Sequence, residues 1–257
     1  MSIDLNSDMG ESFGAYTMGA DDEILRWVTS ANVACGWHGG DPHVMRQTVA
    51  RAKALGVAVG AHPSYPDLLG FGRRPMQITR QEARDYVLYQ IGAVRAFVEA
   101  AGLTLQHVKP HGAIYNVAAQ DRELSLGIAE AVKEAGGGLI LMGLPDSETL
   151  KAAQEVGVRF AREAFGDRAY NEDGSLVSRK IAGSLITDPD RVAERVIGLA
   201  QGRVVAITGK EIRLQADTIC LHGDTPGAAA IAKAVREALN SAGVPVRRLG
   251  EFLGRGV

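Results

Sequence analysis

The chain has 257 residues, enough to bury a substantial core, and its 46% apolar and 23% charged composition is ordinary for a globular protein. A formal net charge of -2 excludes the strong basic excess of a general nucleic-acid binder. No apolar run approaches the ~20 residues that cross a bilayer, the first residues lack the regions of a signal peptide, and two cysteines make no disulfide framework. We therefore expect a cytoplasmic protein without nucleic-acid or membrane partners.

Short apolar runs alternate with helical patterns along the whole chain. Asp41 is followed by Pro42, as at the capped start of a helix, and Thr79 with Glu82 fits a capping box. Strands are predicted, in chain order, over residues 3–6, 30–35, 57–61, 105–109, 139–142, 159–163 and 218–221. Helices are predicted over about 41–56, 79–102, 121–136, 147–156, 188–201 and 225–243.

This repeated order of strand and helix favours an α/β protein with a parallel sheet. A closed barrel and an open doubly wound sheet both fit the order, and a chain of this length suits a single barrel domain. We expect one (β/α) barrel over residues 1–257, seven-stranded and distorted from the TIM barrel. Two short β-rich runs around Thr208-Gly209-Lys210 predict a β-hairpin near 204–215, inserted before the last barrel strand.

Polar residues gather just past the carboxyl ends of the predicted strands, where parallel α/β folds carry their active sites. Five of the six histidines fall in these segments or just beyond them. The predicted catalytic residues are Asp8, Glu11, His38, His62, Lys109, His111 and His222. The predicted substrate-binding residues are Arg73, Arg74, Glu163, Arg168 and Asp224.

Each candidate also has a structural interpretation. Asp8 and Glu11 suit a general base and its partner, because paired carboxylates can hold different protonation states, but they also suit a turn cap and a solvated side chain. His38 and His62 have the residue type of metal ligands or acid–base groups, or of histidines hydrogen-bonded to a loop. A lysine after an apolar strand is costly unless it is paired or used, so Lys109 predicts an oxyanion or carboxylate site or a structural ion pair with Asp8 or Glu163.

Several other residues favour structural roles. Asp41 is predicted to be a helix cap, and Asp224 with Thr225 suits a cap of the last helix as well as a site. Cys35 could be a nucleophile, but a buried strand cysteine is the favoured interpretation. His43 is predicted to lie on the surface of a helix. The adjacent Arg73 and Arg74 suit bidentate binding of an anion or a solvated surface.

Six motifs together resemble the LamB/YcsF family over nearly the whole chain. They are residues 6–11 (NSDMGE), 34–41 (ACGWHGGD), 60–67 (GAHPSYPD), 108–116 (VKPHGAIYN), 167–170 (DRAY) and 220–227 (CLHGDTPG). The chain departs from the usual family pattern at Ser7 (Cys), Gly166 (Ala) and Leu68 (Arg). The last change weakens the case that the loop after His62 contacts an anion.

The resemblance implies ATP-dependent 5-oxoprolinase activity, which opens 5-oxo-L-proline to L-glutamate, and it implies two partner proteins, subunits B and C. The chain has no G-x-x-x-x-G-K-[ST] phosphate loop, so ATP is expected at the level of the complex. The family is similar in fold to the glycoside hydrolase/deacetylase superfamily, whose sugar deacetylases hold a divalent metal with an Asp and two His. By that fold similarity alone, Asp8, His38 and His62 are the predicted metal ligands.

Three hypotheses remain open from the sequence. The first is the lactam-hydrolysing subunit of the ATP-coupled enzyme, in which a water is deprotonated by Asp8 or a neighbouring histidine. The second is a free-standing metal-dependent amidohydrolase or carbohydrate deacetylase, which would act without partners. The third is a non-catalytic subunit that only binds the substrate. Each is compatible with a homo-oligomer.

Overall fold

The computed structural model describes residues 2–223 and 227–254. Within them, seven parallel strands close into one barrel in the order β1-β2-β3-β4-β5-β6-β9. Since β9 pairs with both β6 and β1, the predicted seven-stranded barrel is confirmed and the open sheet is excluded. The strands are β1 (Asp4–Met9), β2 (Ser30–Ala34), β3 (Ala58–His62), β4 (His107–Val108), β5 (Ile140–Gly143), β6 (Arg159–Phe165) and β9 (Thr218–Cys220).

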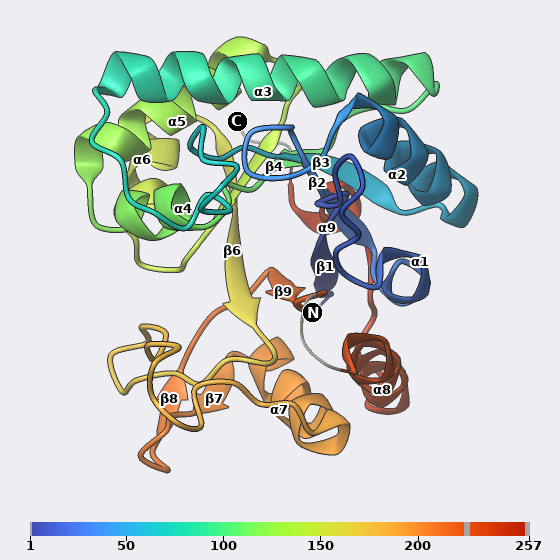
Figure 1. Cartoon of the computed structure of the whole chain (residues 1–257). Helices are drawn as coiled ribbons and strands as arrows, with labels where there is room; N and C mark the ends of the chain where they lie inside the picture. Colours follow the sequence, from blue (N-terminus) through green and yellow to red (C-terminus); the bar gives the residue numbers. More distant parts are fainter. Residues whose placement is uncertain (1, 224–226, 255–257) are drawn as a thin grey trace.

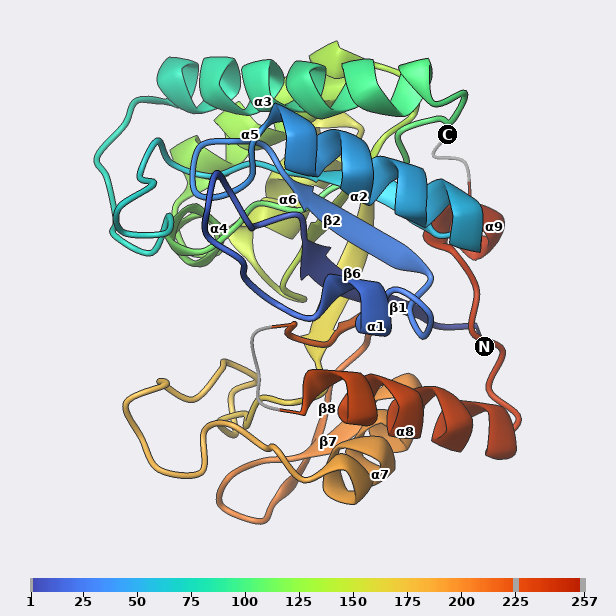
Figure 2. The ribbon, with the colours of Figure 1, turned by 45° about the vertical axis from the view of Figure 1, so that its right-hand side comes forward.

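The helices lie outside this barrel (Figure 1). In Figures 1 and 2, α3 with α2 and α5 covers one side, and α7 with α8 covers the opposite side. The described helices are α1 (Asp21–Ile24), α2 (Pro42–Leu55), α3 (Arg80–Ala100), α4 (Ala113–Ala118), α5 (Arg122–Ala135), α6 (Glu148–Val156), α7 (Pro189–Ala200), α8 (Ala228–Ser241) and α9 (Leu249–Phe252).

Local sequence signals explain where the long helices begin and end. The Asp41 side chain accepts hydrogen bonds from the backbone of His43 and Val44, which confirms its predicted role as a cap. Thr79 and Glu82 form both bonds of the predicted capping box at the start of α3. The short helices α1, α4 and α9 were not predicted, because four to six residues carry too little apolar periodicity.

A long excursion separates β6 from β9, although the two strands are neighbours in the barrel. It contains α7 and an antiparallel pair, β7 (Arg203–Val205) and β8 (Glu211–Arg213), in the segment for which the sequence predicts a hairpin. Figure 2 shows this pair beside α7, away from the barrel. The predicted start of the last helix, at Thr225 and Pro226, lies outside the described residues.

The barrel interior is polar. Strand β1 extends to Met9, so Asp8 lies on the strand and not in the following loop, and alternate residues Asp4, Asn6 and Asp8 follow the two-residue period of a strand. Gly60 on β3 has no side chain where it faces β4, because a Cβ there would overlap the ring of His107. The sequence therefore fills the barrel with hydrogen-bonding groups as well as with apolar ones.

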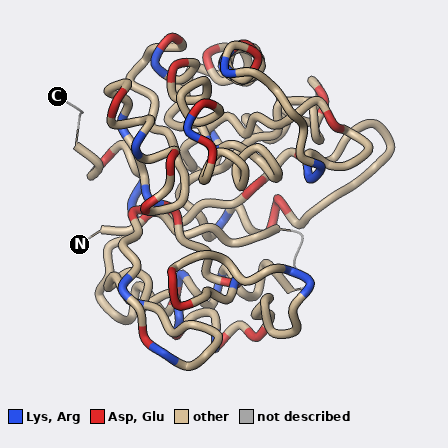
Figure 3. The backbone as a smooth tube through the Cα atoms, turned by 90° about the vertical axis from the view of Figure 1, so that its left-hand side faces the viewer, with Lys and Arg blue, Asp and Glu red and all other residues tan. Residues whose placement is uncertain are grey.

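Charges on the outside are mixed. Figure 3 shows basic and acidic residues interspersed along the chain, which fits the small net charge. Among the described residues, no helix is long and apolar enough to cross a membrane.

Candidate functional site

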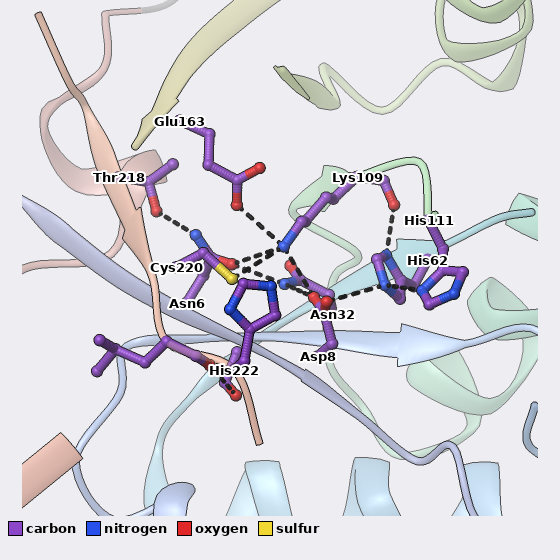
Figure 4. A network of polar contacts seen from close by, with 12 residues as sticks. Asn6, Asp8, Asn32, His62, Lys109, His111, Glu163, Thr218, Cys220 and His222 are labelled. Atoms are coloured by element: carbon purple, nitrogen blue, oxygen red, sulfur yellow. Dashed lines mark hydrogen bonds and ion pairs between the residues drawn. The ribbon is translucent and has the colours of Figure 1, made fainter. Parts of the chain in front are cut away.

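Lys109 lies at the centre of a polar network at the carboxyl end of the barrel (Figure 4). Its Nζ is 2.8 Å from Asp8 Oδ1, 3.0 Å from Glu163 Oε1 and 3.1 Å from Cys220 Sγ. Burial alone would lower the pKa of Lys109, but the neighbouring Asp8, Cys220 and Glu163 raise it well above its usual value. Lys109 is therefore a buried cation held between two carboxyl groups.

Asp8 is held in its ionised form. Burial alone would raise its pKa, but the charges of His62 and Lys109 hold the pKa of Asp8 well below its usual value. Its Oδ1 also accepts a hydrogen bond of 2.8 Å from Asn32 Nδ2. This carboxylate is consequently a weak proton acceptor but a strong hydrogen-bond acceptor.

His62 and His111 face each other from β3 and from the segment after β4. His62 Nδ1 donates to the Lys109 carbonyl at 2.6 Å, and His111 Nε2 donates to the Phe71 carbonyl at 2.9 Å. Because a carbonyl only accepts, each ring is fixed in one tautomer. The other two nitrogens, His62 Nε2 and His111 Nδ1, lie 3.0 Å apart.

His38 and Glu11 complete this cluster. The His38 ring stacks on His111, with centroids 3.7 Å apart and an interplanar angle of 7°, and its Nε2 is 3.3 Å from Glu11 Oε1. Burial and the neighbouring histidines hold the pKa values of His38 and His111 well below normal, so both rings are neutral.

These four side chains offer a donor set that fits a metal ion. One ligand atom from each of Glu11, His38, His62 and His111 lies within 4.8 Å of all the others. Three imidazole nitrogens and a carboxylate oxygen suit Zn²⁺ and similar metals. The set shares His38 and His62 with the ligands predicted by fold similarity, but Asp8 is not part of it.

A strained loop positions the backbone carbonyl that fixes His111. Phe71 has φ of 53°, a conformation that a bulky residue rarely adopts. Gly72 follows with φ of 61°, and a Cβ there would overlap Ser64 Oγ. The loop is also held by Arg74, whose Nε is 3.0 Å from Asp67 Oδ2. Arg74 is thus engaged with Asp67.

His222 forms an acid–base pair with Asp167. Its Nδ1 is 2.9 Å from both Asp167 oxygens, and its ring stacks on Phe165 at 5.5 Å. This contact directs the Nδ1 proton to the carboxylate and leaves Nε2 as the reactive nitrogen. Asp167 was not among the predicted catalytic residues, although it begins the DRAY motif after β6.

A cavity of about 390 Å³ is lined by Asp8 and Lys109 of the polar network and by His222. Its size falls in the lower part of the range for small-molecule sites. Arg168 is 7% exposed, its Nη2 donates to the Val177 carbonyl, and its Nε is without a hydrogen-bond partner among the described residues. The predicted site residues that line the cavity are Asp8, His62, Arg73, Lys109, His111, Arg168 and His222, together with the unpredicted Arg179.

Four predicted residues do not line this cavity. Glu11 and His38 belong to the neighbouring cluster, Arg74 pairs with Asp67, and Glu163 is fully buried below Lys109. Asp224 lies outside the described residues. A separate cavity of about 600 Å³ between α7 and the β7–β8 pair has none of the clustered histidines among its described lining residues.

Comparison with known proteins finds relatives along the entire chain. The LamB/YcsF family model matches residues 3–254. Proteins named as the A subunit of 5-oxoprolinase are similar throughout: that of Thermococcus sibiricus is 52% identical over 98% of this chain and 100% of its own length, and that of Pyrococcus furiosus is 53% identical with the same coverage. The relative from Campylobacter jejuni is 52% identical over 98% of this chain and 99% of its own length.

Solved structures give the same result for the fold. A lactam utilization protein from Thermus thermophilus superimposes with a TM-score of 0.92 at 51% identity, covering 96% of this chain and 99% of that one. The Bc1960 peptidoglycan N-acetylglucosamine deacetylase matches with a TM-score of 0.51 at 11% identity, covering 100% of this chain and 90% of that one. The second likeness concerns the fold alone.

Proposed function

The chain belongs to the LamB/YcsF family, and from this premise we propose that it is the lactam-hydrolysing subunit of an ATP-dependent 5-oxoprolinase. In this proposal it opens 5-oxo-L-proline to L-glutamate in a complex with subunits B and C. The observation that carries the proposal is the full-length similarity to proteins named as the A subunit of 5-oxoprolinase. The ionised network and acid–base pair around one small cavity give it a chemical basis.

The reaction breaks the lactam C–N bond and consumes two waters. One water adds its oxygen to the new carboxylate, and both of its protons end on the ring nitrogen, which becomes the ammonium group. The other water is consumed as ATP becomes ADP, phosphate and a proton. His222 is the proposed acid–base residue, because Asp167 holds its Nδ1 proton and leaves Nε2 to exchange protons with water or the ring nitrogen. Asp8 is too acidic for that task and instead accepts the lactam N–H.

Three arginines give the cavity its proposed specificity for an acid. Arg73, Arg168 and Arg179 line it, and the buried Nε of Arg168 is directed to no hydrogen-bond acceptor among the described residues. We propose that Arg168 and its neighbours bind the substrate carboxylate, because guanidinium groups form strong charge-assisted hydrogen bonds to carboxylates. The chain carries no phosphate-binding loop, which supports ATP chemistry shared with partner subunits.

Reconstitution tests this function. The full chain is combined with subunits B and C, and 5-oxoproline-dependent ATP hydrolysis and glutamate release are measured. His222→Gln should lower glutamate release by at least about 100-fold, in the range of a lost general acid–base group. The matched control is His43→Gln, since His43 is exposed on α2, and it should keep full activity.

The two readouts also separate the hypotheses. No glutamate release from the complete complex would contradict the proposed function, whereas normal turnover in His222→Gln would remove only the assigned role. Variants that change KM but not kcat would support a subunit that binds substrate without catalysis.

A second candidate is a metal-dependent amide hydrolase that acts without partners. The cluster of Glu11 and three histidines favours it, because Zn²⁺ enzymes use such ligands to activate water for attack on amides. It predicts turnover by the isolated chain that is lost on chelation. Partner-dependent, chelator-insensitive turnover would exclude it.

A further inference from the structure

Two imidazole nitrogens face each other in the wall of the cavity. His62 Nδ1 and His111 Nε2 both donate to backbone carbonyls, so His62 Nε2 and His111 Nδ1 are the ring nitrogens that face the site. These nitrogens are 3.0 Å apart. Two imidazole nitrogens at this distance share a cation, either a proton or a metal ion.

Other acceptor atoms converge on the same point. Glu11 Oε1 is 3.4 Å from His111 Nδ1 and 3.3 Å from His38 Nε2. Asp8 Oδ2 is 3.3 Å from His62 Nε2. A single proton can lie between only two of these atoms, whereas a metal ion binds three or four at once.

We propose that Glu11, His38, His62 and His111 form a binding site for one divalent transition-metal ion of the Zn²⁺ class. Three nitrogens and one carboxylate oxygen suit Zn²⁺ or Co²⁺ and do not suit Mg²⁺, which prefers oxygen ligands. The two carbonyl contacts are those expected behind metal-binding histidines, because they fix the tautomer and orient the ring. The strained backbone at Phe71 is part of this support, since it holds one of the two carbonyls.

The four ligands are not equivalent. The rings of His62 and His111 are perpendicular, so one ion can lie near both ring planes. The rings of His38 and His111 are stacked at 7°, so an ion in the plane of His111 lies out of the plane of His38 unless that ring turns. His62, His111 and Glu11 are therefore the strong ligands, and His38 is the weak one.

The site adjoins the reaction cavity without depending on the reaction proposed for it. His62 and His111 line the cavity, whereas Glu11 and His38 are not among its lining residues. An ion held here would be reached from the cavity side, as in metal sites that keep a position for a ligand.

Metal binding by the purified full chain tests the proposal directly. The chain is freed of metal with a chelator and titrated with Co²⁺, whose visible absorption reports nitrogen ligands, and with Zn²⁺ in competition. We expect one ion per chain by elemental analysis after gel filtration. Mg²⁺ should not compete.

Single substitutions then test the ligand ranking. His62→Asn, His111→Asn and Glu11→Gln should each weaken Zn²⁺ binding by at least about 100-fold, and His38→Asn by about 10-fold. The control is His43→Asn, an exposed histidine on α2, which should bind metal as the unchanged chain does. The Glu11 side chain is 14% exposed, and Gln has nearly the same shape as Glu. Glu11→Gln therefore keeps the test valid if a buried histidine variant does not fold.

Two results would overturn the proposal. One is the absence of stoichiometric Co²⁺ or Zn²⁺ binding, together with nitrogen NMR shifts that place a proton on both nitrogens of His62, which would identify the cation as a proton. The other is unchanged affinity in Glu11→Gln and His111→Asn. Neither readout uses 5-oxoproline or ATP, so a failure here is distinct from a failure of the proposed function.

Discussion

The two ends of the barrel interior are built from similar polar residues but differ in how these residues are paired. At the amino end, Asp4 accepts hydrogen bonds from the hydroxyls of Thr29, Ser30 and Thr218, and Thr218 also accepts from Asn6. None of these five side chains has an unpaired buried polar atom among the described residues.

The carboxyl end contains like groups that face each other. The imidazole nitrogens of His62 and His111 meet at 3.0 Å, and Glu163 has Lys109 at 3.0 Å but accepts no well-aligned hydrogen bond from the described residues. Polar residues inside a barrel therefore do not by themselves mark a site. What marks the site is the polarity that the fold leaves unsatisfied, because a buried group without a partner costs free energy until a ligand supplies one.

The largest expected effect is at Lys109. Lys109→Met leaves Asp8 and Glu163 buried without their cation, so we expect a loss of about 3–5 kcal/mol in unfolding free energy. Glutamate release by the reconstituted complex should also fall by at least about 100-fold. Urea unfolding and the activity assay measure the two effects. Lys233→Met on the exposed face of α8 is the control, and a Lys109→Met variant of normal stability would contradict the paired network.

The amino end should show its effect in the dependence of stability on pH. Burial raises the pKa of Asp4 from 3.8 to about 6. Between these values the folded chain holds the Asp4 proton and the unfolded chain releases it, so this residue's contribution to stability falls as the pH rises through the window. Relative to Asp4→Asn, the unchanged chain should lose roughly 2 kcal/mol of unfolding free energy from pH 4 to 7. A difference that stays constant, or grows, across this range would refute the assignment.

A smaller effect is expected from Thr218→Val, which removes one hydroxyl from the amino-end network at nearly constant volume. The hydroxyl donates to Asp4 at 2.6 Å and accepts from Asn6 at 2.8 Å, so its loss should cost about 1–3 kcal/mol. Thr218 does not line the cavity, and only Asn6 connects its hydroxyl to Lys109, so kcat should change much less than stability. A fall in kcat without a fall in stability would mean that the two ends are functionally coupled.

The smallest effect is expected at Tyr65. Its hydroxyl is buried and has no hydrogen-bond partner among the described residues. Tyr65→Phe should therefore leave the free energy of unfolding unchanged or raise it by up to about 1 kcal/mol, as measured by urea unfolding. A clear destabilisation would reveal a partner for this hydroxyl and reduce the contrast between the two ends.

Much of the fold could be predicted from the sequence, because the barrel strands are apolar runs and the long helices carry caps. The extent of β1 could not, since a polar barrel interior makes Asp8 on a strand look like a loop residue. Strand β4 is only two residues long, shorter than predicted, because residues 105–106 and Lys109 fall outside its ladder.

The site was predictable as a gathering of residues but not as a set of contacts. Motifs after separate strands pointed to one end of the barrel, and Lys109 was expected to pair with Asp8 or Glu163; the structure has both contacts. The tautomers of His62 and His111 depend on carbonyls far away in the sequence, which no local pattern reveals. The engagement of Arg74 with Asp67 has the same cause, because it follows from how the loop closes.

The close approach of Gly60 and His107 limits how this barrel can vary. The imidazole occupies the volume that any side chain at position 60 would need. Gly60→Ala alone should therefore destabilise the fold, while the same change should be tolerated once position 107 carries a smaller residue. The two positions are 47 residues apart and lie on adjacent strands, paired directly in register. The residue at one position therefore limits which residues the other position can accept. Among diverging relatives, we expect them to change together or not at all.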